Sequence, residues 1–334
     1  MPRQHKRNLW PPSGKTLLGL LGVVYVVYLI VFGNFVYSWM TGQSGSSDAI
    51  SEHAIDSSST SVVSYWTTSM MNNAVDVDQL IDNSSASNSV DTSQASSDTS
   101  AGKAALQDGQ APSDGSVDYP LSTVGKIFFT NASGQNMVCS GTAVVSSNRN
   151  TVDTAGHCLY WNGSWVRNVI FCPLYNSGAG PYGCWAARDL LVPSEWINAR
   201  SGELHRDFGE AIVSPNDAGN LTDVVGGVGW AYNQPTNSTF YPYGYPAGSP
   251  YNGQTRISCT GAPGKSWQHA GGLVISVPCG MTGGSSGGPW FIQVNGKYYL
   301  NGHNDFTSSI QPGHMFSPYY DDTWFALYNK AQNT

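Results

Sequence analysis

The sequence predicts an all-β domain between residues 119 and 334, preceded by one long apolar segment and a serine-rich stretch. From about Tyr119, short runs of β-branched and aromatic residues alternate with Gly, Pro and Asn turns, as in GKIFFT, GTAVVSS, GGLVISVPC and PWFIQV. Short strands at regular spacing are typical of sandwiches and barrels. Residues 322–331 (DTWFALYNKA) carry apolar side chains at helical intervals, which predicts a C-terminal helix.

The composition favours a protein that works outside the cytoplasm. Of the 334 residues only 11% are charged, the net charge is -7, and no region forms a basic patch, so nucleic acid is not an expected partner. All six cysteines lie after residue 138, which predicts disulfides formed in an oxidising compartment. Neither C-x-x-C nor H-E-x-x-H occurs, so a zinc site is disfavoured, and no metal or organic cofactor is expected.

The N-terminal part predicts a membrane anchor. Residues 16–40 (TLLGLLGVVYVVYLIVFGNFVYSWM) contain no charged residue, and a membrane-spanning helix needs roughly 20 residues. The charged residues before this segment are all basic, so residues 1–15 are expected in the cytoplasm and everything after Met40 outside. A single-pass signal anchor is the interpretation, and late cleavage that releases a secreted form is the alternative.

Residues 41–118 predict a low-complexity stalk or pro-segment. Serine, aspartate and small residues dominate, and such a segment cannot bury enough apolar surface to offset the entropy of ordering it. Residues 62–71 (VVSYWTTSMM) are more apolar, and they either pack on the domain or belong to a pro-segment. The folded domain is therefore expected to span residues 119–334.

Two motifs in this domain carry chemistry. The stretch from Gly284 to Pro289 reads GSSGGP, which fits G-x-S-G-G-P with Ser286 as a nucleophile and Ser285 turned away. Glycines let such a loop aim backbone N–H groups at one point, and those of Gly284 and Ser286 would form an oxyanion hole. A hydroxyl also needs a base, and His157 in TAGHC is the candidate because small residues before it leave room for the imidazole.

TAGHC followed by GSSGGP resembles the chymotrypsin-like (trypsin-fold) serine peptidases. The phrases GYPAGSPYNGQ, PCGMTGGSSGGPW and LNGHNDF make the chain similar to secreted bacterial-type glutamyl-endopeptidase-like members. The resemblance spans about residues 124–331 and implies two antiparallel β-barrels, with catalytic His, Asp and Ser in that chain order at the cleft between them. Asp207 in RDFGEAIV fits the expected aspartate, which would orient His157. Asp189 is the competitor but lacks the following strand pattern, and His205 is expected on a surface loop.

The resemblance also implies disulfides and a specificity pocket. The implied pairs are Cys139–Cys158, Cys172–Cys184 and Cys259–Cys279. The implied pocket residues are Gly280, Thr282 and His303. A partly protonated His303 would favour an acidic residue before the cut, although Asp305 would repel such a substrate if it faced the pocket. The alternative for His303 is a packed strand residue, and Gly280 at the pocket base disfavours Arg or Lys.

Two departures from the family pattern concern activation. Members that are activated by a new N-terminus place an aspartate before the nucleophile, where this chain has Ser285, and no I-V-G-G start occurs near residue 119. The domain is therefore expected to fold directly into its active form with the stalk attached. Sequons that could carry glycans occur at Asn83, Asn131, Asn162, Asn220 and Asn237.

The predicted function is a membrane-anchored serine endopeptidase that cleaves proteins or peptides outside the cytoplasm. The alternative is a catalytically silent binding or adhesion protein of the same fold, displayed on a stalk. A serine esterase of the α/β-hydrolase type is disfavoured, because that class places its histidine last in the chain. The sequence leaves the oligomeric state open.

Overall fold

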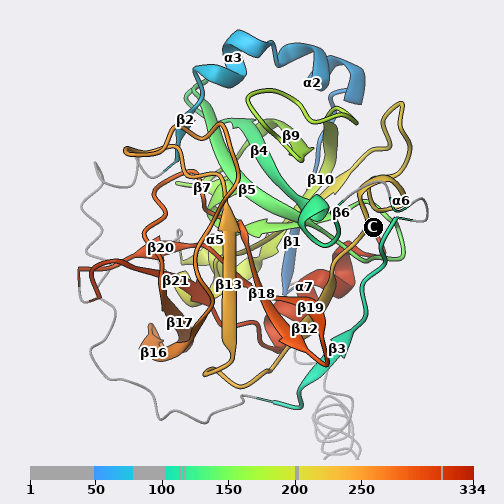
Figure 1. Cartoon of the computed structure of the whole chain (residues 1–334). Coiled ribbons are helices and arrows are strands. Elements are labelled where there is room, and N and C mark those ends of the chain that lie inside the picture. The colour runs from blue at the N-terminus through green and yellow to red at the C-terminus, as the bar shows by residue number, and fades with distance from the viewer. Residues whose placement is uncertain (1–48, 78–101, 113–114, 116–117, 200–202, 310) are drawn as a thin grey trace, which may run out of the picture. The chain divides into compact units, whose positions relative to one another are not determined.

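The computed structural model describes residues 49–77, 102–112, 115, 118–199, 203–309 and 311–334 (Figure 1). The predicted cytoplasmic segment 1–15 and the predicted anchor 16–40 lie outside these residues. No helix in the described part of the chain is long and apolar enough to cross a membrane. The described residues from Ala49 onward belong to a single unit that runs to Thr334.

The first half of this unit is a closed antiparallel β-barrel. Its strands are β4 (Val124–Thr130), β5 (Asn136–Val144), β6 (Thr151–Ala155), β9 (Arg167–Pro173), β10 (Trp185–Pro193) and β11 (Phe208–Val213). They pair in the order β10-β11-β6-β5-β4-β9, and β9 pairs back with β10 to close the ring. In β4, Ile127 and Phe129 pack in one core cluster and Val124 and Phe128 in another, as expected for a strand covered on both faces.

The second half is all-β as well, but its strands form two sheets rather than the single closed barrel that was expected. One sheet contains β3 (Ala105–Gln107), β12 (Gly229–Tyr232), β13 (Thr239–Gly244), β14 (Ile257–Ser258), β15 (Ala262–Pro263), β18 (Pro289–Val294) and β19 (Lys297–His303). The other contains β16 (Lys265–His269), β17 (Gly272–Pro278), β20 (Phe306–Thr307) and β21 (His314–Pro318). The Gly- and Pro-rich chain between β13 and β16 pairs only through two-residue strands, so the ladder does not continue from one sheet to the other.

The C-terminal helix α7 (Asp322–Ala331) has the predicted bounds. It begins where the side chain of Asp321 accepts hydrogen bonds from the N–H groups of Thr323 and Trp324, which satisfies two donors that the helix leaves free. Its buried residues are Trp324, Leu327, Tyr328 and Ala331, which recur at helical spacing. These side chains pack in the same core cluster as residues of β11 and β12, so the helix closes one side of the fold.

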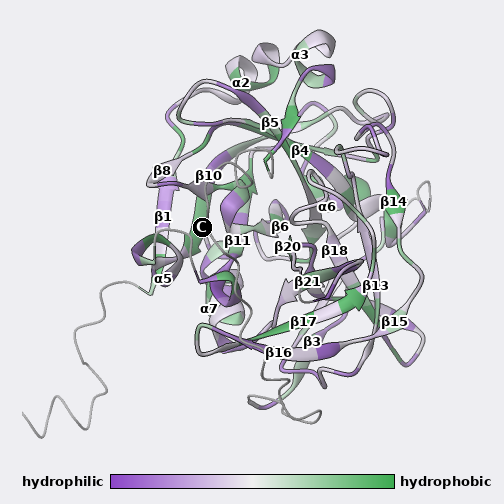
Figure 2. Cartoon of the chain, turned by 90° about the vertical axis from the view of Figure 1, so that its left-hand side faces the viewer, coloured by the Kyte–Doolittle hydropathy of each residue, from purple (hydrophilic) through white to green (hydrophobic). Residues whose placement is uncertain are grey.

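The segment between residues 49 and 77 folds with the domain, whereas the sequence placed it in the stalk. Strand β1 (Ile50–Ala54) pairs antiparallel with β10, and β2 (Val75–Asp76) pairs parallel with β5. Helices α2 (Ser59–Tyr65) and α3 (Thr68–Asn72) lie together at one end of the domain in both views (Figures 1 and 2). These residues therefore belong to the same compact unit as the predicted domain, a unit that runs from Ala49 to Thr334.

Few apolar side chains are enough to order this serine-rich segment. Val62 and Trp66 are buried against the barrel, and the indole of Trp66 donates a hydrogen bond to the carbonyl of Asn168. The ring pairs β10 and β5 over only part of their length on one side, and β1 and β2 pair with the stretches that are left. Residues 62–71 therefore pack on the domain, which was one of the two alternatives for them.

The remaining elements are short connections. They are β7 (Tyr160–Trp161), β8 (Ser164–Trp165), α5 (Ser194–Asn198), α6 (Leu221–Val225), and the 3-10 turns η1 (Leu121–Thr123), η2 (Gly156–Cys158) and η3 (Leu204–Arg206). Two of these turns, η2 and η3, carry or adjoin the predicted catalytic histidine and aspartate.

Candidate active site

Two paired strands bring His157 and Asp207 together. His157 lies in η2, directly after β6, and Asp207 ends η3, directly before β11. Because β6 and β11 are antiparallel and Ala155 pairs with Phe208, the residues that flank this pair meet at one edge of the barrel. A side chain at position 156 would approach the Phe208 carbonyl to 2.8 Å, so Gly156 is the residue that lets the turn come this close.

The carboxylate of Asp207 holds both the backbone and the ring of His157. Oδ1 accepts the backbone N–H of His157 at 2.7 Å, and Oδ2 lies 2.8 Å from Nδ1 of the imidazole. Such a contact places the ring proton on Nδ1 and leaves Nε2 as the basic nitrogen. The competitor Asp189 instead contacts Arg188, with its Oδ2 2.7 Å from Nη1, and its residue pairs with Ala54 of β1.

Burial and charge act against each other in this pair. Burial disfavours the charged imidazole, but the charge and hydrogen bond of Asp207 outweigh it and raise the pKa of His157 well above its ordinary value. Burial likewise opposes ionisation of Asp207, and the partnership with His157 outweighs it and holds the pKa of Asp207 below its ordinary value. Each group therefore favours the charged form of the other, and Asp207 is ionised.

The two adjacent serines have different surroundings. The hydroxyl of Ser285 donates to the carbonyl of Thr282 at 2.8 Å. The hydroxyl of Ser286 makes only a long contact of 3.4 Å with the carbonyl of Asp305, whose carboxyl lies 3.5 Å from Nδ1 of His157. Asp305 therefore contacts Ser286 through its backbone carbonyl and His157 through its carboxyl.

The direct hydrogen bond between Ser286 and His157 is not formed in this structure. Within the described residues, Nε2 of His157 is buried and has no hydrogen-bond partner. Catalytic hydrogen bonds are often loose without substrate and tighten only when it binds. The Ser286 hydroxyl is held by one long contact, with the Asp305 carbonyl at 3.4 Å.

The loop around Ser286 keeps two backbone N–H groups unused. The carbonyl of Gly283 accepts from Ala247 and Gly248, and that of Ser285 accepts from Gly288. In a planar trans peptide the N–H points opposite to the C=O, so the N–H groups of Gly284 and Ser286 face away from these contacts. Gly284 has φ of 89°, a conformation that glycine adopts without strain. Within the described residues neither of these two N–H groups donates a hydrogen bond, and their role as oxyanion donors stays a prediction.

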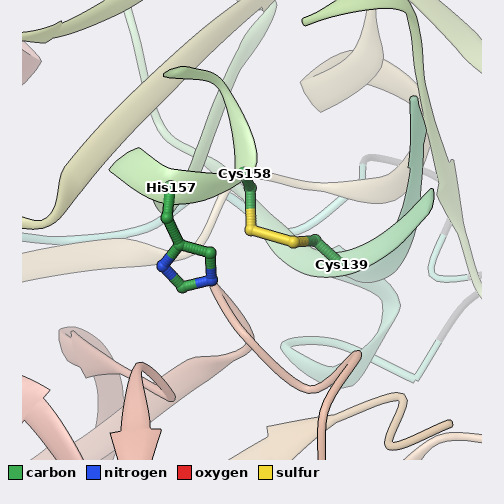
Figure 3. A group of neighbouring side chains, drawn as sticks. All are labelled: Cys139, His157 and Cys158. Atoms are coloured by element: carbon green, nitrogen blue, oxygen red, sulfur yellow. A yellow bond between two sulfur atoms is a disulfide. The ribbon is translucent and has the colours of Figure 1, made fainter. Parts of the chain in front are cut away.

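The three disulfides are those that the resemblance implied. Cys139 bonds to Cys158, Cys172 to Cys184 and Cys259 to Cys279. Figure 3 shows that the imidazole of His157 and the Cys139–Cys158 disulfide leave the same short turn. The residue after Cys139, Ser140, donates its backbone N–H to the Ser286 carbonyl at 2.7 Å, so this bridge joins the histidine turn to β5, the strand that contacts the serine loop.

His303 does not line a pocket, which makes the prediction for this residue wrong. Its Nδ1 lies 2.9 Å from the Tyr320 hydroxyl and its Nε2 lies 3.0 Å from the Asp207 carbonyl, and the residue is fully buried. With both ring nitrogens bonded, it has none left for a substrate carboxylate. The alternative of a packed strand residue is the one found.

The other two predicted pocket residues are accessible. Gly280 is exposed, with open space where a side chain would extend, and Thr282 is half-buried with its hydroxyl donating to the Gly248 carbonyl. His205 is 5% exposed instead of lying on the surface, because its ring packs against Gly272 and near His269.

The position of Asp305 beside the histidine–aspartate pair was not predicted from the sequence. The sequence suggested a charge that could face the pocket, and the structure buries that carboxyl beside His157 and Asp207. Nδ1 of His157 and one carboxyl oxygen from each aspartate lie within 4.8 Å of one another, a spacing that would also suit a metal ion. Here, however, the contact between His157 and Asp207 already occupies Nδ1.

Comparisons with known proteins agree with this geometry. The glutamyl endopeptidase of Bacillus licheniformis is 31% identical over 162 residues, which are 46% of this chain and 45% of that protein, so less than half of the relative's length is matched. The thermostable serine protease AL20 from an extremophilic microorganism is 37% identical, with a TM-score of 0.57, over 64% of this chain and 98% of AL20. Protease Anisep from Arthrobacter nicotinovorans is 36% identical, with a TM-score of 0.58, over 68% of this chain and 100% of Anisep.

No family model matches the chain. This chain nevertheless covers AL20 and Anisep almost completely, and it is 37% and 36% identical to them, respectively. The chain therefore belongs to the chymotrypsin-like serine endopeptidases and is similar to their glutamyl-endopeptidase members.

Proposed function

We propose that the protein hydrolyses peptide bonds with Ser286 as nucleophile, His157 as general base and Asp207 as the group that orients His157. The observation that carries this proposal is the double contact of Asp207 with His157, at 2.7 Å to the backbone N–H and 2.8 Å to Nδ1. The proposal is also supported by Asp305, whose carbonyl accepts the Ser286 hydroxyl at 3.4 Å and whose carboxyl lies 3.5 Å from Nδ1 of His157. A nucleophile, a base and a group that orients the base are parts that acyl transfer requires.

The mechanism follows from the roles of these groups. The Ser286 hydroxyl turns from the Asp305 carbonyl to Nε2 of His157, gives up its proton and attacks the substrate carbonyl. The N–H groups of Gly284 and Ser286 stabilise the negative oxygen that develops, while Asp207 stabilises the imidazolium. His157 then protonates the leaving amine, and water hydrolyses the acyl-enzyme with His157 again acting as base.

The substrates of this reaction are proteins or peptides. The likeness to glutamyl endopeptidase supports a preference for an acidic residue before the cleaved bond. His303 does not contribute to such a preference, since its two nitrogens bond Tyr320 and Asp207. Recognition of an acidic side chain would therefore rest on other groups near Gly280 and Thr282.

We further propose that the domain acts outside the cytoplasm, attached through residues 16–40. Three disulfides support an oxidising compartment, and the uncharged segment preceded only by basic residues supports the orientation. Asn162 and Asn237, two of the sequon asparagines, are exposed and could carry glycans in a secretory pathway.

The triad is tested by hydrolysis of a mixed peptide library with variants of the full chain. Ser286→Ala and Asp207→Asn are expected to lower kcat/KM, the latter by about 10,000-fold, because asparagine fixes the wrong tautomer of the histidine. Ser285→Ala and Asp189→Asn are the matched controls, and both are expected to stay within about threefold of the unchanged protein.

The outcome separates the enzyme from the alternative. If Asp189→Asn abolishes hydrolysis and Asp207→Asn does not, the assignment of the aspartate is wrong. If the folded, disulfide-intact protein cleaves no peptide in the library, the chain is a silent binding protein built on this fold.

A further inference from the structure

A second carboxyl group lies against the histidine–aspartate pair. Asp305 follows β19 and is fixed by its own backbone, whose N–H donates to the Phe316 carbonyl at 2.9 Å and whose carbonyl accepts the Ser286 hydroxyl at 3.4 Å. Its side chain is only 1% exposed, and its Oδ1 lies 3.5 Å from Nδ1 of His157. The mechanism described above assigns this carboxyl no role.

The Asp305 carboxyl has no ordinary hydrogen-bond donor. In the described part of the chain, neither of its oxygens has a hydrogen-bond partner, and no lysine or arginine forms an ion pair with it. The titratable groups around it are His157 and Asp207, together with Tyr320, whose hydroxyl donates to Asp153. His303 on its own segment is engaged with Tyr320 and Asp207.

Keeping both Asp305 and Asp207 charged in this buried site would carry a large desolvation and repulsion penalty. An unpaired buried carboxylate loses its hydration and regains its neutral form by keeping a proton. Burial, aided by the nearby charge of Asp207, raises the pKa of Asp305 well above its ordinary value, whereas that of Asp207 lies below its own. Asp207 has two contacts with His157 and Asp305 has only one at 3.5 Å, so the proton belongs on Asp305.

We propose that Asp305 is a positioning residue that stays protonated at neutral pH and donates a hydrogen bond to the carboxylate of Asp207. This inference rests on the proposed triad. Two carboxyl groups can share a hydrogen bond only when one of them holds a proton, and the interaction between these two side chains lowers the pKa of Asp207 and raises that of Asp305. The pair then carries one negative charge, and Asp207 alone acts on His157.

The proton on Asp305 keeps His157 usable as a base. A charged Asp305 would add a second negative charge beside the imidazole, raise its pKa further and leave it protonated over a wider pH range. A protonated histidine cannot accept the Ser286 proton. Because its carbonyl also contacts Ser286, Asp305 links the positions of the aspartate, the histidine and the serine.

The test is the pH profile of acylation by a fluorophosphonate, measured on the full chain and its Asp305 variants between about pH 5 and 10. Asp305→Asn keeps a neutral donor, so its rate at neutral pH is expected within about threefold of the unchanged protein, with the acid limb at the same pH. Asp305→Ala loses the donor and is expected to react about tenfold more slowly or worse. Asp189→Asn is the control, since Asp189 is another aspartate with a raised pKa but lies away from the site.

Two results would overturn the proposal. If the acid limb of Asp305→Asn moves by about one pH unit or more to lower pH, Asp305 is charged in the native protein. If Asp305→Ala reacts like the unchanged protein, Asp305 has no positioning role. Failure of the unchanged protein to react would instead refute the triad and leave this proposal without its premise.

A measurement on the unchanged protein covers the case in which the variants do not fold. The carboxyl carbons of selectively labelled aspartates report protonation in NMR titrations. One aspartate is expected to remain protonated at pH 7, and ionisation of every aspartate at that pH would overturn the proposal. Labelling aspartate alone keeps the signal of Glu210, a second buried acid with a raised pKa, out of the spectrum.

Discussion

Lys126 is a buried lysine on β4, and we expect the protein to become more stable as the pH rises past 8 because of it. The residue is 2% exposed, its ammonium donates to the Gly253 carbonyl at 2.8 Å, and it lies 4.8 Å and 4.9 Å from the ring centres of Phe128 and Tyr175. No carboxylate is paired with it within the described residues. Burial lowers the pKa of Lys126 from 10.5 to about 8.

The sign and size of the effect follow from proton linkage. Between pH 8 and 10.5 the unfolded chain holds a proton on Lys126 and the folded protein does not, so the free energy of unfolding rises with pH. A shift of this size corresponds to about 3 kcal/mol at about 1.4 kcal/mol per pKa unit. Tyrosines with raised pKa values, such as Tyr119 and Tyr328 at about 12, oppose this only above pH 10.

The assay is denaturant unfolding at fixed pH values from 7 to 10, with the disulfides intact, on the unchanged protein and on Lys126→Met. Methionine retains a flexible stem of similar length and cannot be charged. Between pH 7 and about pH 10, the unfolding free energy of the unchanged protein is expected to rise relative to that of the variant by most of the 3 kcal/mol. Parallel pH profiles for the two proteins would show that Lys126 titrates alike when folded and unfolded.

Two further predictions concern Asn304 and His205. The Asn304 side chain donates to the carbonyls of Tyr243 and Ser285 and accepts from the indole of Trp290. Because these partners would each lose a hydrogen bond, Asn304→Ala is expected to destabilise the fold by about 2 kcal/mol or more and to slow acylation of Ser286. Denaturant unfolding and fluorophosphonate kinetics check this, and acylation at the native rate would contradict it. Burial lowers the pKa of His205 to about 4, so the folded protein binds fewer protons there than the unfolded chain, and stability is lost as the pH falls from 6.5 toward 4. His205→Phe is expected to lose less stability over that range in thermal unfolding, and an equal loss would refute the assignment.

Patterns that are local in the sequence predicted their elements well. Helix α7 has the predicted bounds, because its apolar spacing and the capping Asp321 both specify a helix. The strands followed from short β-branched and aromatic runs between turn residues. The pairing of His157 with Asp207 and the three disulfides came through the family resemblance, since nothing in the spacing alone relates residues so far apart.

Features that depend on tertiary contacts were not predicted. Residues 49–77 read as a stalk because serine dominates them, yet Val62, Trp66 and the paired strands β1 and β2 order the segment against the barrel. His303 has the strand position of a pocket residue, but its ring points to Tyr320 and Asp207. The side on which a side chain of an irregular strand end lies is set by the packing around it, not by its neighbours in sequence.

The central claim is that Ser286, and not its neighbour Ser285, is the nucleophile. Its most direct test is to treat the purified protein with a fluorophosphonate and to locate the label by mass spectrometry, with Ser286→Ala and Ser285→Ala alongside. Because the Ser285 hydroxyl is bonded to Thr282 and that of Ser286 makes only one long contact, with the Asp305 carbonyl, the label is expected on Ser286 and lost only in Ser286→Ala. Label on Ser285, or no label on the folded protein with its disulfides intact, would contradict the account.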